Sequence, residues 1–203
     1  MQGRTHNMVG IACAMGTAGI ITEGNVSLPV MITSIVAGGL GGLAADIDEK
    51  KSLGRKYISK LASTLLFIAV FLYMYKGKID LKQFQPIYEH INYTRLVIGG
   101  LLLSIIYVYG MHTPHRTFMH SITICIASSI CIFIALPSFA LYYAVGYGSH
   151  LLIDLFNRKK EQLLWPLKIG KICFNLCDAD GIVNDMIFFI AAVGVFIMLV
   201  KYI

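Results

Sequence analysis

The chain has 203 residues, of which 57% are hydrophobic and only 14% are charged, and its formal net charge at pH 7 is +6. Soluble domains contain about 25% charged residues. This composition, with a mean hydropathy of +0.71, therefore excludes a soluble globular protein and predicts an integral membrane protein. The positive charge predicts no nucleic-acid partner, because no basic patch is interleaved with aromatic side chains that could stack on bases.

Apolar stretches divide the chain into about seven predicted membrane segments. In chain order they are residues 7–22, 26–45, 61–75, 96–111, 120–136, 138–156 and 186–203. A spanning helix needs roughly 20 mostly apolar residues, so several of these segments are short. Together they predict an all-α fold, a polytopic transmembrane helical bundle that forms a single integral membrane domain over residues 1–203.

Two local patterns add detail to this bundle. The second segment is rich in Gly and Ala between residues 37 and 45, and small residues let helix backbones approach closely in lipid. We therefore expect this helix to be central. Thr113, Pro114 and His115 are typical of an N-cap followed by proline in the first turn, so they predict that the fifth helix begins there.

The distribution of lysine and arginine orients the bundle. With the N-terminus inside, 12 of the 17 Lys and Arg residues lie on the inner side of the membrane. The other five are Lys76, Lys78, Lys82, Arg95 and Lys201. This asymmetry follows the positive-inside rule, and attraction to anionic membrane lipid accounts for the rest of the net charge. Residues 157–185 are then predicted to be cytoplasmic or interfacial.

His150 and Asp154 lie one helical turn apart in the apolar run 144–156. Residues four apart share a face of a helix, so this imidazole and this carboxylate can bind one ion. Ionisable side chains inside a membrane segment are costly and usually mark a functional site. The alternative is a buried polar pair that joins two helices.

Three further places combine His or Asp with a predicted membrane boundary. They hold His6 before the first helix, Asp46 and Asp48 after the second, and His115 and His120 before the fifth. In the orientation above, all of them face the cytoplasm together with His150 and Asp154. The aspartates also fall near C-terminal helix ends, where the helix dipole disfavours negative charge unless a cation is bound. Each of these residues alone could equally be an ordinary interfacial side chain.

The seven residues together have the chemistry of a metal centre. The predicted ligands are His6, Asp46, Asp48, His115, His120, His150 and Asp154. Imidazole and carboxylate together suit zinc, manganese or iron. Seven residues exceed the three protein ligands of a catalytic zinc site, so we expect two divalent ions, with zinc as the first choice and manganese or iron as alternatives.

His115 and Arg116 are the predicted catalytic residues. His115 and His120 are five residues apart, about 140° around a helix, so we expect one to be a ligand and the other to support it. His115 is thus a ligand or an acid–base residue. Arg116 offers only donors and cannot bind a metal, so we expect it to orient an anionic group of the substrate.

Other polar residues are interpreted as structural. His90 lies in the predicted outer loop, and His112 is less well placed than its neighbours. Residues 178–180 suggest a solvated turn before the last helix. Asp185, at the start of that helix, could join the site.

The motifs that carry these residues resemble a known family. They are Asp46-Ile-Asp48, His115-Arg-Thr-Phe-Met-His120-Ser121, Gly146-Tyr-Gly-Ser-His150-Leu-Leu-Ile-Asp154 and Leu164-Trp-Pro166. They resemble the YdjM-like inner-membrane proteins, a family described as LexA-regulated, membrane-bound, metal-dependent hydrolases. In similar proteins Leu-Pro usually precedes the aspartates, whereas Ala44-Ala45 stand here. A more distant likeness of ligand spacing to zinc-dependent phospholipase C implies phosphoester substrates.

Residues and resemblance together predict a multi-pass hydrolase of the inner (cytoplasmic) membrane with a metal site on its cytoplasmic side. The expected substrate is an anionic phosphoester or ester, and membrane lipid fits a site at the boundary. One alternative is a metal-ion binding or transport protein that uses the same cluster. A transport path, however, requires ionisable residues distributed through the depth of the membrane. A structural or regulatory membrane protein without chemistry is the other.

Overall fold

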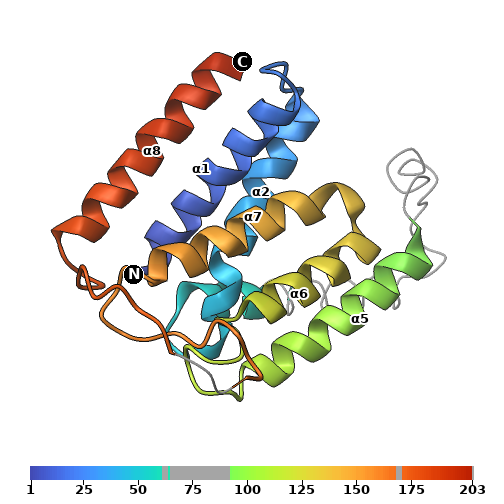
Figure 1. Ribbon diagram of the computed structural model, residues 1–203. Coiled ribbons are helices and arrows are strands. Elements are labelled where there is room, and N and C mark those ends of the chain that lie inside the picture. The colour runs from blue at the N-terminus through green and yellow to red at the C-terminus, as the bar shows by residue number, and fades with distance from the viewer. Residues whose placement is uncertain (61–63, 65–91, 168–170, 203) are drawn as a thin grey trace.

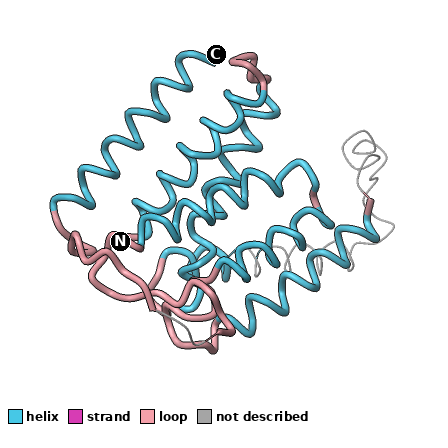
Figure 2. The backbone as a smooth tube through the Cα atoms, viewed as in Figure 1, coloured by secondary structure: helices cyan, strands magenta, loops and turns pink. Residues whose placement is uncertain are grey.

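The computed structural model describes residues 1–60, 64, 92–167 and 171–202. Within them lie the helices α1 (Gly3–Ile21), α2 (Leu28–Ala44), α5 (Tyr93–Gly110), α6 (Ile122–Ala135), α7 (Pro137–Asp154) and α8 (Ile182–Tyr202), with a 3-10 helix η1 (Ala45–Asp48). Residues 53–60 are also helical. The described residues form no β-strand, so the prediction of an all-α fold is confirmed (Figures 1 and 2).

Six of the seven predicted segments correspond to observed helices, and the segment 61–75 lies outside the described residues apart from position 64. Three stretches among the described residues are long and apolar enough to cross a membrane: Leu28–Asp48, Tyr93–Gly110 and Ile182–Tyr202. At 14 residues, α6 is shorter. The outer faces of α5 and α8 expose large apolar side chains such as Leu101, Ile105, Phe189 and Phe196, as expected for surfaces in contact with lipid.

Helix α2 is central, as its small residues predict. It packs against both α1 and α7, and Figure 1 shows these three helices side by side, with α8 outside α1 and the pair α5 and α6 beside α7. A Cβ added at Gly10 or Gly146 would overlap the carbonyl of Gly38, and one added at Gly42 would overlap the carbonyl of His6. Glycine is therefore what lets the three backbones approach closely enough to bring their ends together.

The prediction that the fifth helix begins at Thr113–His115 is wrong. Residues 111–121 form an irregular loop, and α6 begins at Ile122, where the hydroxyl of Ser121 accepts a hydrogen bond from the N–H of Ile124 (3.2 Å). Arg116 has φ +65°, a left-handed conformation that a helix cannot continue through. Contacts of this loop with the rest of the molecule outweigh its local capping signals.

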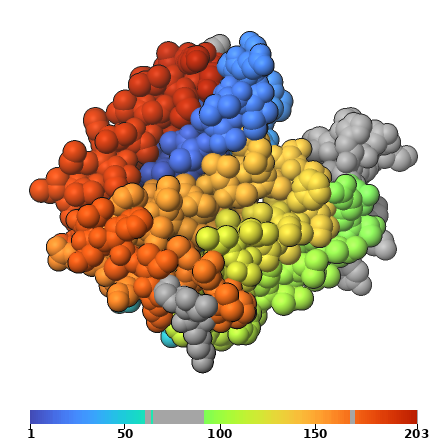
Figure 3. Space-filling model, viewed as in Figure 1, coloured from blue at the N-terminus to red at the C-terminus, as the bar shows by residue number. Residues whose placement is uncertain are grey.

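The two loops that follow α5 and α7 meet at one end of the bundle. The N–H of Gln162 donates to the carbonyl of Arg116 (3.1 Å), and the N–H of Ile122 donates to the carbonyl of Leu163 (2.9 Å). In the space-filling view the segment after α7, in orange, spreads over this end of the molecule (Figure 3).

Candidate metal centre

Four segments that are far apart in the sequence converge at this end of the bundle. Their contributions are His6 from α1, Asp46 and Asp48 from η1, His115, Arg116 and His120 from the loop 111–121, and His150 and Asp154 from α7. Close packing of α1, α2 and α7 aligns the first turn of α1 with the last turn of α7 and with η1 (Figure 1). The structure thus brings all seven predicted ligands into one cluster.

Two imidazole nitrogens of this cluster each lie near the same two carboxylate oxygens. The Nε2 atoms of His120 and His150 both lie 3.6 Å from Oδ1 of Asp46. The same two nitrogens lie 3.9 and 4.0 Å from Oδ2 of Asp154. Ligand atoms about 2.1 Å from a tetrahedral ion are about 3.4 Å apart. The spacing is therefore slightly wider than a four-ligand metal site requires.

These nitrogens lack any other partner. The side chains of His120 and His150 are fully buried, and both Nε2 atoms lie buried without a hydrogen bond. Buried polar atoms in proteins are nearly always hydrogen-bonded, so each exception needs an explanation. A cation between the imidazoles and the carboxylates provides one, and the residues present fit such an ion.

Neighbouring groups orient the imidazoles. Nδ1 of His150 lies 2.7 Å from the carbonyl oxygen of Gly42, which can only accept, so this nitrogen carries the proton and leaves the lone pair of Nε2 free for a metal. Asp48 receives a hydrogen bond from Nδ1 of His115 (2.8 Å) and lies 3.3 Å from Nδ1 of His120. Because residues 111–121 are a loop, both histidines reach the same aspartate, which a regular helix would not allow.

Asp154 connects the four-atom group to α1. Its Oδ1 lies 3.0 Å from Nε2 of His6 and 2.6 Å from the amino nitrogen of Met1, and it accepts a hydrogen bond from Asn157 (2.7 Å). The ring of His6 stacks on that of His150 at 3.7 Å. Oδ1 of Asp154 thus contacts groups of α1, whereas Oδ2 lies near His120 and His150, so this carboxylate could take part in holding ions on either side.

Arg116 lies against this carboxylate. One Nη donates to Oδ2 of Asp154 (2.8 Å) and the other to the carbonyl of Lys159 (2.7 Å). A non-glycine residue with φ near +65° is strained by roughly 1–3 kcal/mol, and such strain persists where surrounding contacts impose it. The backbone of Arg116 is held in this way, with its guanidinium fixed to Asp154.

Glu161 is a further cluster member that the sequence did not predict. Its side chain is fully buried, and burial raises its pKa to about 8. One of its oxygens lies close to donor atoms of His120 and Asp154, all three within 4.8 Å of one another. It follows Arg158-Lys159-Lys160, a run typical of solvated surface, so only the fold reveals it.

The electrostatics of the cluster are dominated by carboxylates. Asp46, Asp48, Asp154 and Glu161 are all buried. Burial lowers the pKa of His120, but the nearby carboxylates of Asp46 and Asp48 outweigh it and raise this pKa to about 10. The site therefore has a strong preference for positive charge.

The residues interpreted as structural lie elsewhere. Asp185 does not join the cluster: its carboxylate is 62% exposed and pairs with Arg4 at 2.8 Å. His112 is exposed, with Nδ1 on the carbonyl of Val108 (2.8 Å). His90 lies outside the described residues.

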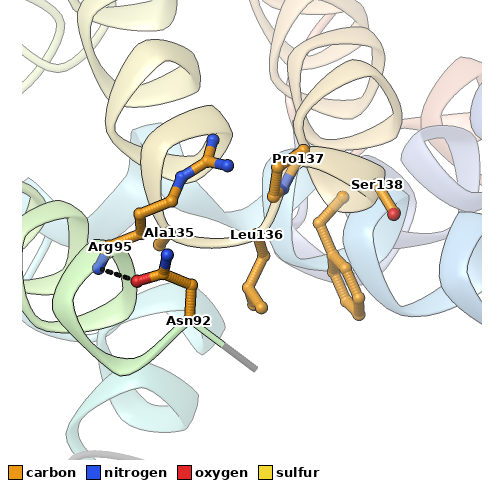
Figure 4. Close-up of a pocket in the computed structure, with 7 residues that line it drawn as sticks. Asn92, Arg95, Ala135, Leu136, Pro137 and Ser138 are labelled. Carbon is orange, nitrogen blue, oxygen red and sulfur yellow. Dashed lines mark hydrogen bonds between the residues drawn. The ribbon is translucent and has the colours of Figure 1, made fainter. Parts of the chain in front are cut away.

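A cavity of about 290 Å³ lies at the opposite ends of α5, α6 and α7, lined by residues such as Asn92, Arg95 and Ser138 (Figure 4). Asn92 and Arg95 make hydrogen bonds with backbone atoms. Asn92 accepts a hydrogen bond from the N–H of Arg95 (3.1 Å), whose side chain donates to the carbonyl of Ile134 (3.2 Å). The cavity is separate from the buried cluster.

Comparisons with known proteins give one result. No curated protein and no solved structure matches the chain. A family model described as YdjM inner membrane protein matches residues 1–202, almost the entire length, and the chain therefore belongs to this family.

Proposed function

We propose that the protein is a membrane-bound, metal-dependent hydrolase with a cytoplasm-facing, dinuclear His/Asp site that acts on a phosphoester or ester. The observation that carries the proposal is a pair of buried Nε2 atoms without hydrogen bonds, those of His120 and His150. Each lies 3.6 Å from Oδ1 of Asp46 and 3.9 or 4.0 Å from Oδ2 of Asp154. Histidine and carboxylate ligands are those of hydrolytic zinc, manganese and iron sites.

The charge of the cluster supports bound cations. Four buried carboxylates face the guanidinium of Arg116 and the amino group of Met1. This leaves two more carboxylates than permanent cations, and protons on His120 and Glu161, whose pKa values are raised to about 10 and about 8, make up the difference. A divalent ion would displace these protons and supply the positive charge instead. A second ion would lie beside His6, whose ring nitrogens have no hydrogen bond and whose Nε2 lies 3.0 Å from Oδ1 of Asp154.

The proposed reaction uses residues at the edge of this cluster. A bound divalent ion would supply the nucleophile, since it lowers the pKa of water to about 7. His115 has a side chain that is 31% exposed and hydrogen-bonded to Asp48, so it is positioned to exchange protons with an arriving substrate. Arg116 would orient an anionic group only after releasing one of its two present contacts.

Lipid is the substrate class that the setting favours. The cluster lies at the end of α2, a helix long and apolar enough to cross a membrane. A lipid headgroup could therefore reach the cluster while the acyl chains stay in the bilayer. The cytoplasmic side, in the inner membrane, is proposed from the positive-inside distribution of Lys and Arg.

The first test is metal content. Detergent-purified wild type, Asp154→Ala, His150→Ala and the control His112→Ala are analysed by plasma mass spectrometry. We expect close to two equivalents of zinc, manganese or iron in wild type and control, and loss of metal from the other two variants. A folded wild type that stays metal-free after supplementation would refute the proposal.

The second test is activity on defined probes. Bis(para-nitrophenyl) phosphate, para-nitrophenyl acetate and phosphatidylglycerol vesicles cover phosphodiester, ester and lipid substrates. We expect hydrolysis of at least one probe that is lost with the metal. Metal binding without hydrolysis, together with ion flux in proteoliposomes, would instead favour the transport alternative.

A further inference from the structure

Glu161 has no hydrogen-bonding partner although its side chain is fully buried. Both of its carboxylate oxygens lack a hydrogen bond. Nη1 of Arg116 lies 3.5 Å from its Oε1, a distance too long for a good charge-assisted hydrogen bond. A buried carboxylate left in this state is strongly unfavourable.

The position of Glu161 is set by its backbone rather than by Arg116. Its N–H donates to the carbonyl of Ile172, and the N–H of Ile172 donates back to its own carbonyl, both at 2.9 Å. The next residue, Gln162, donates to the carbonyl of Arg116 (3.1 Å). These bonds hold the loop against the cluster and direct the carboxylate toward His120 and Asp154.

Pairing with Arg116 does not explain this placement. The guanidinium already donates to Asp154 (2.8 Å) and to the carbonyl of Lys159 (2.7 Å). If Glu161 served only to neutralise Arg116, it would not be needed, because Asp154 already pairs with this guanidinium. The oxygen of Glu161 instead shares the space near His120 and Asp154, two of the four residues around the proposed ion.

We propose that Glu161 is a fifth ligand of the ion held by Asp46, His120, His150 and Asp154. This inference rests on the proposed metal centre. Two imidazole nitrogens and three carboxylate oxygens suit an ion with five or six ligands, such as Mn²⁺ or Fe²⁺, better than zinc, which takes four in most protein sites. One position would remain for water or substrate on a six-coordinate ion.

The test compares two carboxylates of the same loop. Glu161→Gln removes the proposed ligand at nearly constant size. Asp178→Asn removes a carboxylate that is 64% exposed and paired with Arg158 (3.2 Å). Metal-free, detergent-purified full-length protein is titrated with Mn²⁺ and with Zn²⁺. We expect Glu161→Gln to weaken Mn²⁺ binding at least about tenfold, to weaken Zn²⁺ binding less, and Asp178→Asn to match wild type.

The visible absorption of bound Co²⁺ reports the number of ligands directly. We expect the absorption bands of Co²⁺ to be more intense in Glu161→Gln than in wild type, because loss of one ligand lowers the coordination number and the bands strengthen as that number falls. If Glu161→Gln does not fold, the same titration is made with Glu161→Asp. This variant keeps the charge but retracts the carboxylate by one methylene group, so it should also bind Mn²⁺ more weakly than wild type.

The outcomes separate this inference from the proposed function. Metal binding that is lost in Asp154→Ala but unchanged in Glu161→Gln, with one Co²⁺ spectrum for both wild type and Glu161→Gln, overturns the role of Glu161 alone. A wild type that binds no ion overturns the metal centre and this ligand with it.

Discussion

The two ends of the helical bundle differ in the exposure and hydrogen bonding of their polar side chains. Where α5 begins, Asn92 and Arg95 are exposed and their polar groups bind backbone atoms of α5 and α6. At the other end His120, His150 and Glu161 are fully buried, and nitrogens or oxygens of each lack a partner. At the first end these polar side chains are exposed or bound to the backbone, whereas at the second end buried polar atoms have no partner.

This difference distinguishes polar side chains that cap helices from those that could bind an ion. Polar residues at helix ends usually satisfy backbone groups that the helix leaves free, and the α5 end does no more than this. Buried atoms without partners cost free energy on folding, so a protein keeps them where something else compensates. The contrast between the ends is therefore the strongest reason to look for an ion at only one of them.

The largest effect should come from removing a donor at the buried end. His120→Ala deletes an Nε2 atom placed 3.6 Å from Asp46 and 3.9 Å from Asp154. We expect metal affinity to fall more than about 100-fold, beyond the range for residues that only orient ligands. Arg95→Ala, at the opposite end, should bind metal like wild type. Isothermal titration of both variants measures this, and equal affinities would remove the contrast between the ends.

A smaller effect should follow from a residue that orients the imidazoles. Asp48→Asn keeps the size of the side chain but removes the charge that faces Nδ1 of His115 and His120. We expect metal affinity to fall about 10- to 100-fold. A larger loss, matching that of His120→Ala, would mean that Asp48 binds the metal directly.

The sequence predicted the helices well because the hydrophobic stretches are long. Six of the seven segments were recovered among the described residues, since apolar length is set by the bilayer and not by tertiary contacts. Local capping signals were less reliable. Pro137 does begin α7, yet Thr113-Pro114 does not begin α6, because the loop after α5 is held by contacts with the distant segment 155–167.

The cluster could be anticipated only in part. The spacing of His150 and Asp154 and the placement of the other histidines and aspartates at one membrane side predicted that they meet, and they do. Their roles as ligands stay predictions. Glu161 could not be found, because its burial depends on how the loop after α7 folds back, and nothing in its basic neighbourhood signals this.

The unpartnered state of Glu161 should make the metal-free protein sensitive to pH. Burial raises its pKa to about 8 from 4.5, so it binds a proton more tightly when folded than when unfolded. The tighter proton binding therefore adds to the free energy of unfolding. This added stability is fully present below about pH 4.5, falls as the pH rises toward 8, and changes no further above that. Relative to wild type, Glu161→Gln should raise the melting temperature more at pH 8 than at pH 5, by at least about 2 °C. Thermal unfolding of metal-free protein at both pH values measures it, and equal differences at both would contradict the raised pKa.

The smallest effect on metal binding is expected where the polar side chain already has a backbone partner. Asn92→Ala removes the N-cap of α5, whose side chain accepts from the N–H of Arg95 (3.1 Å). Loss of such a cap costs about 1 kcal/mol, which lowers the melting temperature by about 2–4 °C. Thr94→Ala, at an exposed position in the same turn, serves as the control for lost polarity. Metal content should equal that of wild type in both variants, because a satisfied cap acts on stability alone. If Asn92→Ala also lost metal, the two ends of the bundle would be coupled, and unpartnered atoms at one end could no longer be considered separately from capped helices at the other.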